Sequence, residues 1–465
     1  MNRRALLALP PLYAAAATIG WPDGAAAQAQ PQAGGSPTGS NVAPLAPRQP
    51  PLPLAKPEEV GLDPGRLGRI RPFFEAEVAE SRLPGAVVMI ARRGRLAYSE
   101  SIGFRDRQGN APMTPEAVFR LYSMTKPLVT VAATMLMEEG RIGLADPVGK
   151  YLPGFDRLQV SVAQGGGGGS GAGATYETAA TARPMLVYDL LRHTSGLAYG
   201  ELTQNAPVRD AYTRARLYQP GVLDYDSRGP SPQEFVQGLA QAPLARQPGT
   251  TWEYGLSIDA LGRVVEAASG MRLEQFLEER LFRPLRMVDA GFSLRGSQGE
   301  RLAMHSGVDP AQNNQPVGML DVSKPPGNAS GGAGGLAGAG DYLRFAQMLA
   351  NGGSLDGARI LSPAAVRLMT SDHIAGLAAP LPPGMLLFGS PGYGFGFGMM
   401  VRLADGGAVV PGYAGQFMWA GYGGTYFWVD PKAELVVVMM TAAPSVARGG
   451  YRRLMMQLAY GAVES

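Results

Sequence analysis

Apolar side chains recur at spacings of three and four over residues 63–81, which predicts an amphipathic helix at the start of the folded body. The short apolar run over residues 86–91 predicts a strand, and residues 95–101 are its expected partner across a turn that contains glycine. Residues 128–140 form a longer apolar segment that ends at a glycine, which predicts a second helix. The body of the chain is therefore expected to open on helix, strand, strand and helix.

Helical spacing continues through the middle of the chain and gives way to strands in the last third. Residues 257–268 and 273–282 are examples of the helices expected in the middle. The strands and final helix expected after them cover residues 394–403, 416–420, 424–430, 434–441 and 449–460. Strands at both ends with helices between them predict one α/β sheet domain in which the first and last strands pair.

This order of elements predicts two domains built from three stretches of chain. The sheet domain takes residues 58–130 and 330–465, and a mainly helical domain is inserted as residues 131–329. A glycine-rich tract at residues 165–173 predicts a flexible loop inside the helical domain. Loops of the two domains meet at their boundary, which is the expected place for a cleft.

The N-terminus has the pattern of an export signal. Arg3 and Arg4 precede a short apolar stretch and then small residues, which predicts a signal peptide over residues 1–29 and a periplasmic or secreted protein. The arginine pair leaves both the general secretory and the twin-arginine route open. Residues 30–57 are rich in proline, glycine, alanine and glutamine, which predicts a disordered linker.

Composition removes several classes of site and partner. The 465 residues include no cysteine, which excludes disulfides, thiolate metal sites and a cysteine nucleophile. The three histidines, His193, His305 and His373, show no metal-ligand spacing, so no metal is expected. The net charge of +3 gives no reason to expect a nucleic-acid partner. No segment after residue 29 has 18 uncharged apolar residues, so no membrane span is expected there.

Ser123-Met124-Thr125-Lys126 is a Ser-x-x-Lys pattern between an extended run and the apolar helix. Because positions i and i+3 lie on one helix face, the Lys126 amine can reach the Ser123 hydroxyl. The helix N-terminus favours negative charge on Ser123, and burial would lower the pKa of Lys126 towards that of a base. The alternative is a helix-capping serine beside a solvated lysine.

Two further segments carry candidate chemistry. Trp252-Glu253-Tyr254 places a tyrosine before a helix, and near a lysine cation its phenolate form is favoured and can relay protons. The alternative is an aromatic residue of the core. Residues 419–425, Trp-Ala-Gly-Tyr-Gly-Gly-Thr, place small residues beside a strand, where backbone N–H groups can approach a ligand closely. The alternative there is a simple bulge or turn.

In this order, the three segments resemble the motifs of the serine β-lactamase and penicillin-binding-protein superfamily. The similarity covers most of residues 58–460 and is closest to the class C β-lactamase-like branch, within it to the family VIII carboxylesterases. Further motifs that support it lie at residues 190–197 (LLRHTSGL), 331–336 (GGAGGL), 341–346 (DYLRFA) and 425–431 (TYFWVDP). The resemblance implies an antiparallel sheet flanked by helices, with an inserted mainly helical domain.

The resemblance also implies the roles of individual residues. Ser123 would be the nucleophile that forms an acyl-enzyme, and Lys126 the general base, alone or shared with Tyr254. Tyr254 would pass a proton to the leaving group and activate water, and the backbone N–H groups of Ser123 and Tyr422 would form the oxyanion hole. His193 belongs to a family motif without a catalytic role, and the family needs no metal or cofactor.

Two departures from the β-lactamase pattern bear on the substrate. Trp419 stands where β-lactamases and peptidases have the lysine that binds a substrate carboxylate, and Leu256 stands where class C enzymes have an asparagine. With Ala420 and Gly421, these are the predicted substrate-binding residues, and they favour an uncharged, more apolar acyl group. We therefore expect an esterase acting on a small-molecule ester, as a monomer or small homo-oligomer. The alternatives are a β-lactamase or D,D-peptidase, and a transacylase or amide hydrolase of the same fold.

Overall fold

The computed structural model describes residues 49–164, 175–219 and 229–464. The described residues from Pro50 onward belong to one compact unit. The predicted signal peptide, the linker up to residue 48 and the glycine-rich loop at 165–173 lie outside the described residues.

An antiparallel sheet forms the centre of the fold. Within the described residues its eight strands lie in the order β12-β13-β14-β15-β16-β1-β2-β3. Strand β1 pairs antiparallel with β16, with Val88 opposite Met439, so the first and last strands meet as predicted. The strands are β1 (Gly85–Arg92), β2 (Arg95–Asp106), β3 (Ala111–Pro112), β12 (Tyr393–Phe395), β13 (Met400–Arg402), β14 (Phe417–Ala420), β15 (Tyr426–Asp430) and β16 (Leu435–Thr441).

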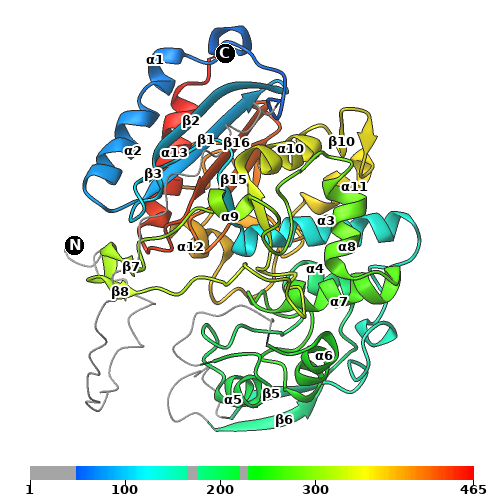
Figure 1. The fold of residues 1–465 in the computed structure, drawn as a ribbon. Helices are drawn as coiled ribbons and strands as arrows, with labels where there is room; N and C mark the ends of the chain where they lie inside the picture. The colour runs from blue at the N-terminus through cyan, green and yellow to red at the C-terminus, as the bar shows by residue number, and fades with distance from the viewer. Residues whose placement is uncertain (1–48, 165–174, 220–228, 465) are drawn as a thin grey trace, which may run out of the picture. The chain divides into compact units, whose positions relative to one another are not determined.

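Helices cover both faces of this sheet. Every residue of β1, β15 and β16 is buried, and because successive side chains of a strand point to opposite faces, both faces must be covered. Helix α10 (Ala339–Ala350) packs on β1, β15 and β16, and α2 (Ile70–Ala79) packs on β1 and β2. Figure 1 shows α2 to the left of these strands and α10 to their right. The predicted α/β fold with a helix-flanked antiparallel sheet is confirmed.

The second group of elements is mainly helical and is centred on a pair of long helices, α3 (Thr125–Glu138) and α7 (Ser257–Ser269). Helices α4 (Val187–Leu191) and α8 (Leu273–Leu277) pack on α7. This part of the chain also contains a hairpin of β5 (Gln159–Ala163) and β6 (Tyr176–Ala180), which the sequence pattern did not predict. The division into two domains stays a prediction.

The remaining elements are short. The helices are α1 (Pro64–Leu67), α5 (Ala206–Arg214), α6 (Pro232–Gln241), α9 (Gln298–Arg301), α11 (Pro363–Met369), α12 (Pro383–Phe388) and α13 (Arg448–Gly461). The strands are β4 (Val118–Arg120), β7 (Val308–Asp309), β8 (Gln315–Pro316), β9 (Leu336–Gly338), β10 (Ser354–Leu355) and β11 (Ala358–Arg359). Single turns of other helix types lie at η1 (Pro57–Val60), η2 (Tyr122–Met124), η3 (Val148–Lys150), η4 (Glu278–Phe282) and η5 (Pro310–Gln312).

Two predicted elements are divided in the structure. The helix expected over residues 63–81 is interrupted between α1 and α2, where Gly68 caps the first piece. The strand expected over 394–403 is two antiparallel strands, β12 and β13. Gly398 lies in the turn between them with φ 68°, a left-handed conformation that glycine adopts without strain, so the chain can reverse there.

The end of the predicted linker is part of the folded body. Leu52 is buried, and Leu54 forms a parallel bridge with Leu96 of β2. The Arg344 guanidinium also donates to the carbonyl of Pro51. The prediction of disorder is therefore wrong for residues 50–57. Apolar side chains of this segment pack into the core and its backbone carbonyl groups accept hydrogen bonds, and composition alone does not reveal either contact.

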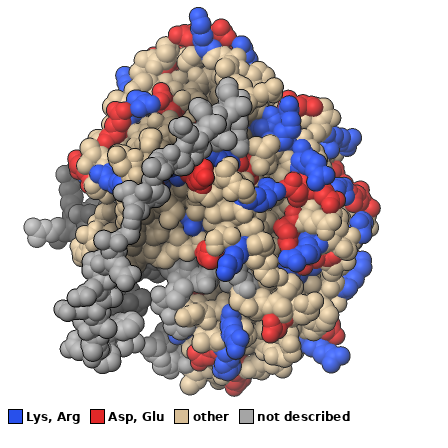
Figure 2. All heavy atoms as spheres, viewed as in Figure 1, with Lys and Arg blue, Asp and Glu red and all other residues tan. Residues whose placement is uncertain are grey.

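The surface carries charges of both signs. On the face drawn in Figure 2, basic and acidic side chains lie interspersed, as the small net charge predicts. Within the described part of the chain, no helix combines the length and the hydrophobicity needed to cross a membrane.

Replacement of Phe74 tests the packing of α2 on the sheet. Its ring is fully buried, so Phe74→Ala should lower the free energy of unfolding by about 3–5 kcal/mol through lost burial and a cavity. The neighbouring Phe73 is only partly buried, so Phe73→Ala is the matched control and should cost clearly less. Urea unfolding followed by circular dichroism measures both, and equal losses would contradict this packing.

Candidate active site

Ser123 lies in a single turn, η2, between β4 and α3. The serine therefore precedes the first residue of the helix by two positions instead of starting it. Tyr122, directly before it, has φ 47°, in the left-handed region that a bulky side chain rarely adopts. The Tyr122 hydroxyl accepts the Leu320 N–H at 3.2 Å, and its ring lies edge-on to that of Tyr422 at 5.5 Å. These contacts fix the turn that presents Ser123.

Lys126 is fully buried, with its amine surrounded by oxygen atoms. Its Nζ donates to Ser123 Oγ at 3.3 Å, to the Tyr199 hydroxyl at 2.9 Å and to the Gly332 carbonyl at 2.9 Å. Burial lowers the pKa of Lys126 to about 7, and the carboxylates of Asp259 and Glu201 oppose this shift. A neutral amine is therefore accessible near pH 7.

The neutral amine suits this environment. It has two N–H groups, for which the Tyr199 hydroxyl and the Gly332 carbonyl provide acceptors, and one lone pair. Ser123 Oγ is the remaining neighbour of Nζ, so that lone pair can take the proton of the Ser123 hydroxyl. The structure thus brings the Ser-x-x-Lys pair together, and the alternative of a solvated lysine is wrong.

Tyr254 also contacts Ser123. Its hydroxyl donates to Ser123 Oγ at 2.7 Å. Burial raises the pKa of Tyr254 above its ordinary value, although the Ser123 hydrogen bond acts in the opposite direction. The expected preference for the phenolate is therefore wrong, because burial disfavours the charged form of this side chain. Tyr254 keeps its proton and can donate it.

Aromatic side chains hold the Tyr254 ring in place. The ring centroids of His193, Tyr199, Trp419 and Trp252 lie 4.9, 5.4, 5.4 and 6.1 Å from that of Tyr254. Such contacts at van der Waals distance restrict the ring to one position.

His193 fixes the backbone on both sides of Tyr254. Its carbonyl accepts the Glu253 N–H at 2.9 Å, and its Nδ1 accepts the Gly255 N–H at 3.4 Å. Burial, and then the charge of Lys126, lower the pKa of His193 well below its ordinary value, so the ring is neutral. Since Nδ1 accepts, the proton lies on Nε2, and this histidine acts here as a positioning group.

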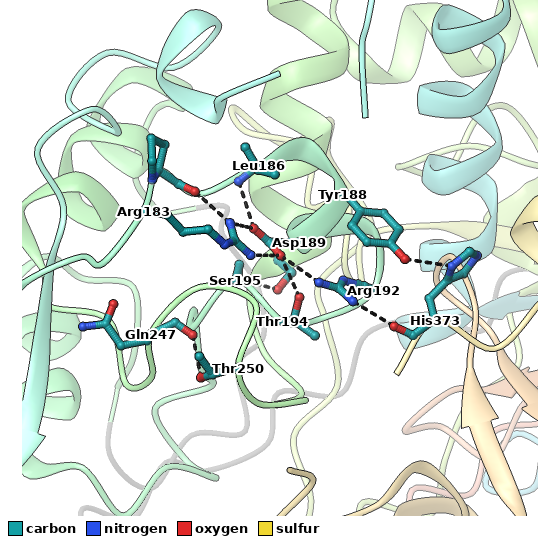
Figure 3. A network of polar contacts seen from close by, with 12 residues as sticks. Arg183, Leu186, Tyr188, Asp189, Arg192, Thr194, Ser195, Gln247, Thr250 and His373 are labelled. Atoms are coloured by element: carbon teal, nitrogen blue, oxygen red, sulfur yellow. Dashed lines mark hydrogen bonds and ion pairs between the residues drawn. The ribbon is translucent and has the colours of Figure 1, made fainter. Parts of the chain in front are cut away.

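The segment that carries His193 is itself held by a buried carboxylate, Asp189 (Figure 3). Asp189 accepts two hydrogen bonds from Arg183, at 2.7 and 2.9 Å, and one from the Thr194 hydroxyl at 3.0 Å. Burial alone would raise the pKa of Asp189, but hydrogen bonds from Arg183 and the Leu186 N–H keep it below its ordinary value. The carboxylate stays charged and fixes residues 190–197.

The turn after β14 packs on the chain just before Ser123. The Gly421 N–H donates to the Thr425 carbonyl at 2.8 Å, and the Thr425 hydroxyl donates to the Leu121 carbonyl at 3.2 Å. A Cβ at position 421 would overlap that same Leu121 carbonyl, so only glycine fits there. The structure thus brings Tyr422 close to the Ser123 segment, as the predicted oxyanion hole requires.

Three predicted substrate-binding side chains are almost completely buried. Trp419, Ala420 and Leu256 are 0%, 3% and 4% exposed. The Trp419 ring packs between Tyr254 and Phe395, with ring centroids 5.4 and 5.3 Å away. In the structure its large ring fills space beside Tyr254, and the substrate-binding role of Trp419 stays a prediction.

Sequence reasoning missed several groups around Lys126. Asp259 lies in the first turn of α7, where an aspartate is ordinarily explained by the helix itself. Its buried Oδ1 also accepts from the Ser330 hydroxyl at 2.5 Å and from the Gly332 N–H at 3.0 Å. The backbone of Gly332 therefore links the carboxylate to the lysine amine, through its N–H on one side and its carbonyl on the other. Tyr199 was also missed. Its position two residues after the 190–197 motif is the one feature of the sequence that could have pointed to it.

Metal binding has no obvious ligands in this structure. In the described ranges, no three or more histidine, cysteine, aspartate or glutamate side chains are grouped so that they could hold a metal ion.

Comparison with known proteins establishes the family. The family model described as Beta-lactamase matches residues 70–459, most of the chain. The chain belongs to the Beta-lactamase family. Within it, the chain is 32% identical over 404 residues to esterase EstB of Burkholderia gladioli, covering 83% of this chain and 93% of that protein. It is 29% identical over 385 residues to lovastatin esterase of Penicillium rubens (strain ATCC 28089 / DSM 1075 / NRRL 1951 / Wisconsin 54-1255), covering 78% and 89%.

Solved structures of other proteins have the same fold. EstCE1, described as a hydrolase with promiscuous acyltransferase activity, is 28% identical with a TM-score of 0.68, covering 86% of this chain and 99% of that one. Unliganded simvastatin synthase from Aspergillus terreus is 23% identical with a TM-score of 0.68, covering 85% and 98%, and shows the fold alone. These findings confirm the place of the chain in the serine β-lactamase superfamily, close to the family VIII esterases.

The Asp259 carboxylate should set the pH at which Lys126 becomes neutral. Because this negative charge raises the pKa of Lys126, Asp259→Asn should lower that pKa further, by about one unit. The neutral amine then persists at lower pH, so the acid limb of Ser123 reactivity should move to lower pH. The rate of fluorophosphonate labelling at Ser123, measured against pH, checks this shift.

Asp341→Asn is the matched control, because Asp341 is a buried aspartate in the first turn of another helix, α10. In the Asp341→Asn variant, the labelling rate of Ser123 should fall at the same acidic pH as in the wild type. An unchanged limb in Asp259→Asn would show that Lys126 feels no charge from Asp259.

Proposed function

We propose that this protein is a serine hydrolase that cleaves carboxylic esters through an acyl-enzyme on Ser123. The observation that carries the proposal is the position of Ser123 Oγ, 3.3 Å from the Lys126 amine and 2.7 Å from the Tyr254 hydroxyl. A nucleophile with one group able to take a proton and another able to give one is the arrangement that acyl transfer needs. The esterase relatives support the ester as substrate.

In the first half of the reaction, Ser123 Oγ attacks the ester carbonyl carbon while its proton passes to the neutral Lys126 amine. The resulting tetrahedral intermediate carries its negative charge on the former carbonyl oxygen, which the backbone N–H groups of Ser123 and Tyr422 stabilise. The bond from carbon to the alcohol oxygen then breaks, and the departing alkoxide takes the Tyr254 proton. The Lys126 proton returns to Tyr254, which leaves the acyl-enzyme, the free alcohol and a neutral lysine.

In the second half, water replaces the alcohol. Its oxygen attacks the acyl carbon and its proton passes to the Lys126 amine through the Tyr254 hydroxyl. Collapse of the intermediate breaks the bond to Ser123 Oγ, which recovers a proton and releases the carboxylic acid. The pKa of Lys126, about 7, suits a group that gains and loses a proton in each half.

The motif residues favour an uncharged acyl group. No lysine stands at position 419 to bind a substrate carboxylate, and Leu256 offers no amide group to an acylamino side chain. Both features support an ester over a penicillin or a cell-wall peptide. Export to the periplasm or medium is part of the proposal, on the residue pattern of positions 1–29 alone.

Acyl transfer to an alcohol is the second candidate. Relatives of this chain include monacolin J acid methylbutanoyltransferase of Aspergillus terreus, 28% identical over 401 residues, and the structural relative EstCE1 is described as having acyltransferase activity. The chemistry differs only in the group that attacks the acyl-enzyme, an alcohol instead of water. The same residues would serve both reactions.

Steady-state hydrolysis of p-nitrophenyl esters, from acetate to decanoate, tests the proposal beside a chromogenic cephalosporin. Ser123→Ala should reduce ester turnover by at least about 10³-fold, because no other group can form the acyl-enzyme. Tyr254→Phe should reduce it by about 10²- to 10³-fold, because the leaving group loses its proton donor. Tyr188→Phe is the matched control, since that hydroxyl contacts His373 and not Ser123.

Efficient cephalosporin turnover with poor ester cleavage would refute the esterase and favour a β-lactamase. Ester turnover that survives in Ser123→Ala would refute the nucleophile. Release of p-nitrophenol that rises with added alcohol, with formation of the new ester, would favour the transferase.

A further inference from the structure

The peptide that joins Gly421 to Tyr422 carries one donor of the proposed oxyanion hole. Its N–H belongs to Tyr422 and its carbonyl to Gly421. None of the described peptide bonds is cis, so the two groups of this peptide point in opposite directions. A group that binds the Gly421 carbonyl therefore lies on the side of the peptide that faces away from the substrate oxygen.

A buried arginine of α13 binds that carbonyl. The Arg452 guanidinium donates from Nη2 to the Gly421 oxygen at 2.8 Å, and the side chain is 3% exposed. The Gly424 N–H donates to the same oxygen at 3.2 Å, which closes the turn after β14. The carbonyl thus accepts one neutral hydrogen bond and one from a charged donor, and the second is the stronger kind.

A positive charge on a carbonyl oxygen also acts on the N–H of the same peptide. Arginine stays protonated in proteins. Its charge draws the electrons of the peptide towards the oxygen, which leaves the N–H hydrogen more positive and a better donor. The effect is large in a buried site, because the low dielectric constant there strengthens hydrogen bonds that polarise one another. The Tyr422 N–H should therefore bind an oxyanion more tightly than an ordinary backbone N–H does.

The charge of Arg452 also reaches the centre of the site. Burial raises the pKa of Tyr254, and the charge of Arg452 is one of the influences that oppose this shift, since it favours the phenolate anion. The same charge favours a negative oxygen on the carbon bound to Ser123, whose Oγ lies 2.7 Å from the Tyr254 hydroxyl. The ester carries no such charge before attack, so the stabilisation acts on the transition state.

We propose that Arg452 is a positioning residue of the oxyanion hole, which holds and polarises the peptide between Gly421 and Tyr422 so that the Tyr422 N–H stabilises the tetrahedral intermediate. Arg452 acts through this peptide and not by contact with the substrate. This inference rests on the proposed function, since it adds a residue to the same reaction. The last helix of the described chain thereby contributes to the chemistry at Ser123.

Two replacements of Arg452 test the inference in the whole chain. Arg452→Met removes the charge at similar side-chain length and should lower kcat/KM for p-nitrophenyl acetate by about tenfold, part of the ~10²–10³ that loss of a whole oxyanion donor costs. Arg452→Lys restores a charged donor and should recover kcat/KM to within about threefold of the wild type. Arg453→Met is the matched control, because Arg453 also donates to a carbonyl, that of Phe388 at 2.8 Å, and its kcat/KM should equal that of the wild type.

Phenylboronic acid gives a readout that loss of folded protein does not move. Its boron binds the Ser123 oxygen, whose proton passes to the Lys126 amine, and becomes a tetrahedral anion like the intermediate. Arg452→Met should raise the Kd of this adduct by about the same factor by which it lowers kcat/KM. A merely structural role would lower the number of binding sites and leave the Kd of the remaining sites unchanged.

If Arg452→Met does not fold, Arg452→Gln takes its place, since it also removes the charge but keeps a polar side chain. Turnover and boronate affinity near the wild-type values in the uncharged variant, or equal losses in Arg452→Lys, would overturn the inference while Ser123-dependent ester cleavage by the wild type upholds the esterase. Absence of Ser123-dependent cleavage in the wild type would overturn both.

Discussion

The burial of one amine, that of Lys126, is the constraint on which the rest of the site depends. A lysine removed from water loses the hydration of its charge, and this loss brings its pKa down to about 7. The pKa of Lys126 falls no further, because the nearby carboxylates of Asp259 and Glu201 favour the charged form of the amine. The amine can therefore hold a proton in one step and release it in the next, which acyl transfer through Ser123 requires.

The backbone can approach the Lys126 amine closely only where the residue is a glycine. The Gly332 carbonyl accepts from Lys126 and its N–H donates to Asp259, so both backbone polar groups of this one residue are used. A Cβ at position 332 would overlap the Asp259 carboxylate, which explains a glycine there. The turn at Gly421 shows the same requirement, since a Cβ there would overlap the Leu121 carbonyl and the Thr425 hydroxyl. Glycine is thus required at positions 332 and 421 because a larger side chain would not fit in this crowded polar site.

Sequence patterns predicted the strands, the helices and the motif residues of the site. They did not predict properties that depend on contacts between distant segments. The pairing of β1 with β16 could be expected from the order of the strands, and the contact of Ser123 with Lys126 from their spacing. The approach of Tyr254 to both was expected from the resemblance to a known family. The protonation of Tyr254 could not be expected, because the burial that raises its pKa comes from rings contributed by distant segments. Asp259 carried no signal either, since an aspartate in the first turn of a helix is ordinarily explained by the helix itself.

The two sides of the scissile bond meet different chemistry. On one side, Trp419 and Leu256 take the places of a cation and an amide, which removes the recognition of a carboxylate or acylamino group. On the other side, the Tyr254 hydroxyl lies 2.7 Å from Ser123 Oγ, where a departing alcohol would take its proton. A site can discriminate strongly against a substrate that leaves its buried polar groups unpaired, whereas added apolar contact discriminates weakly. With apolar side chains at both of these motif positions, selection among uncharged acyl chains should therefore be weak.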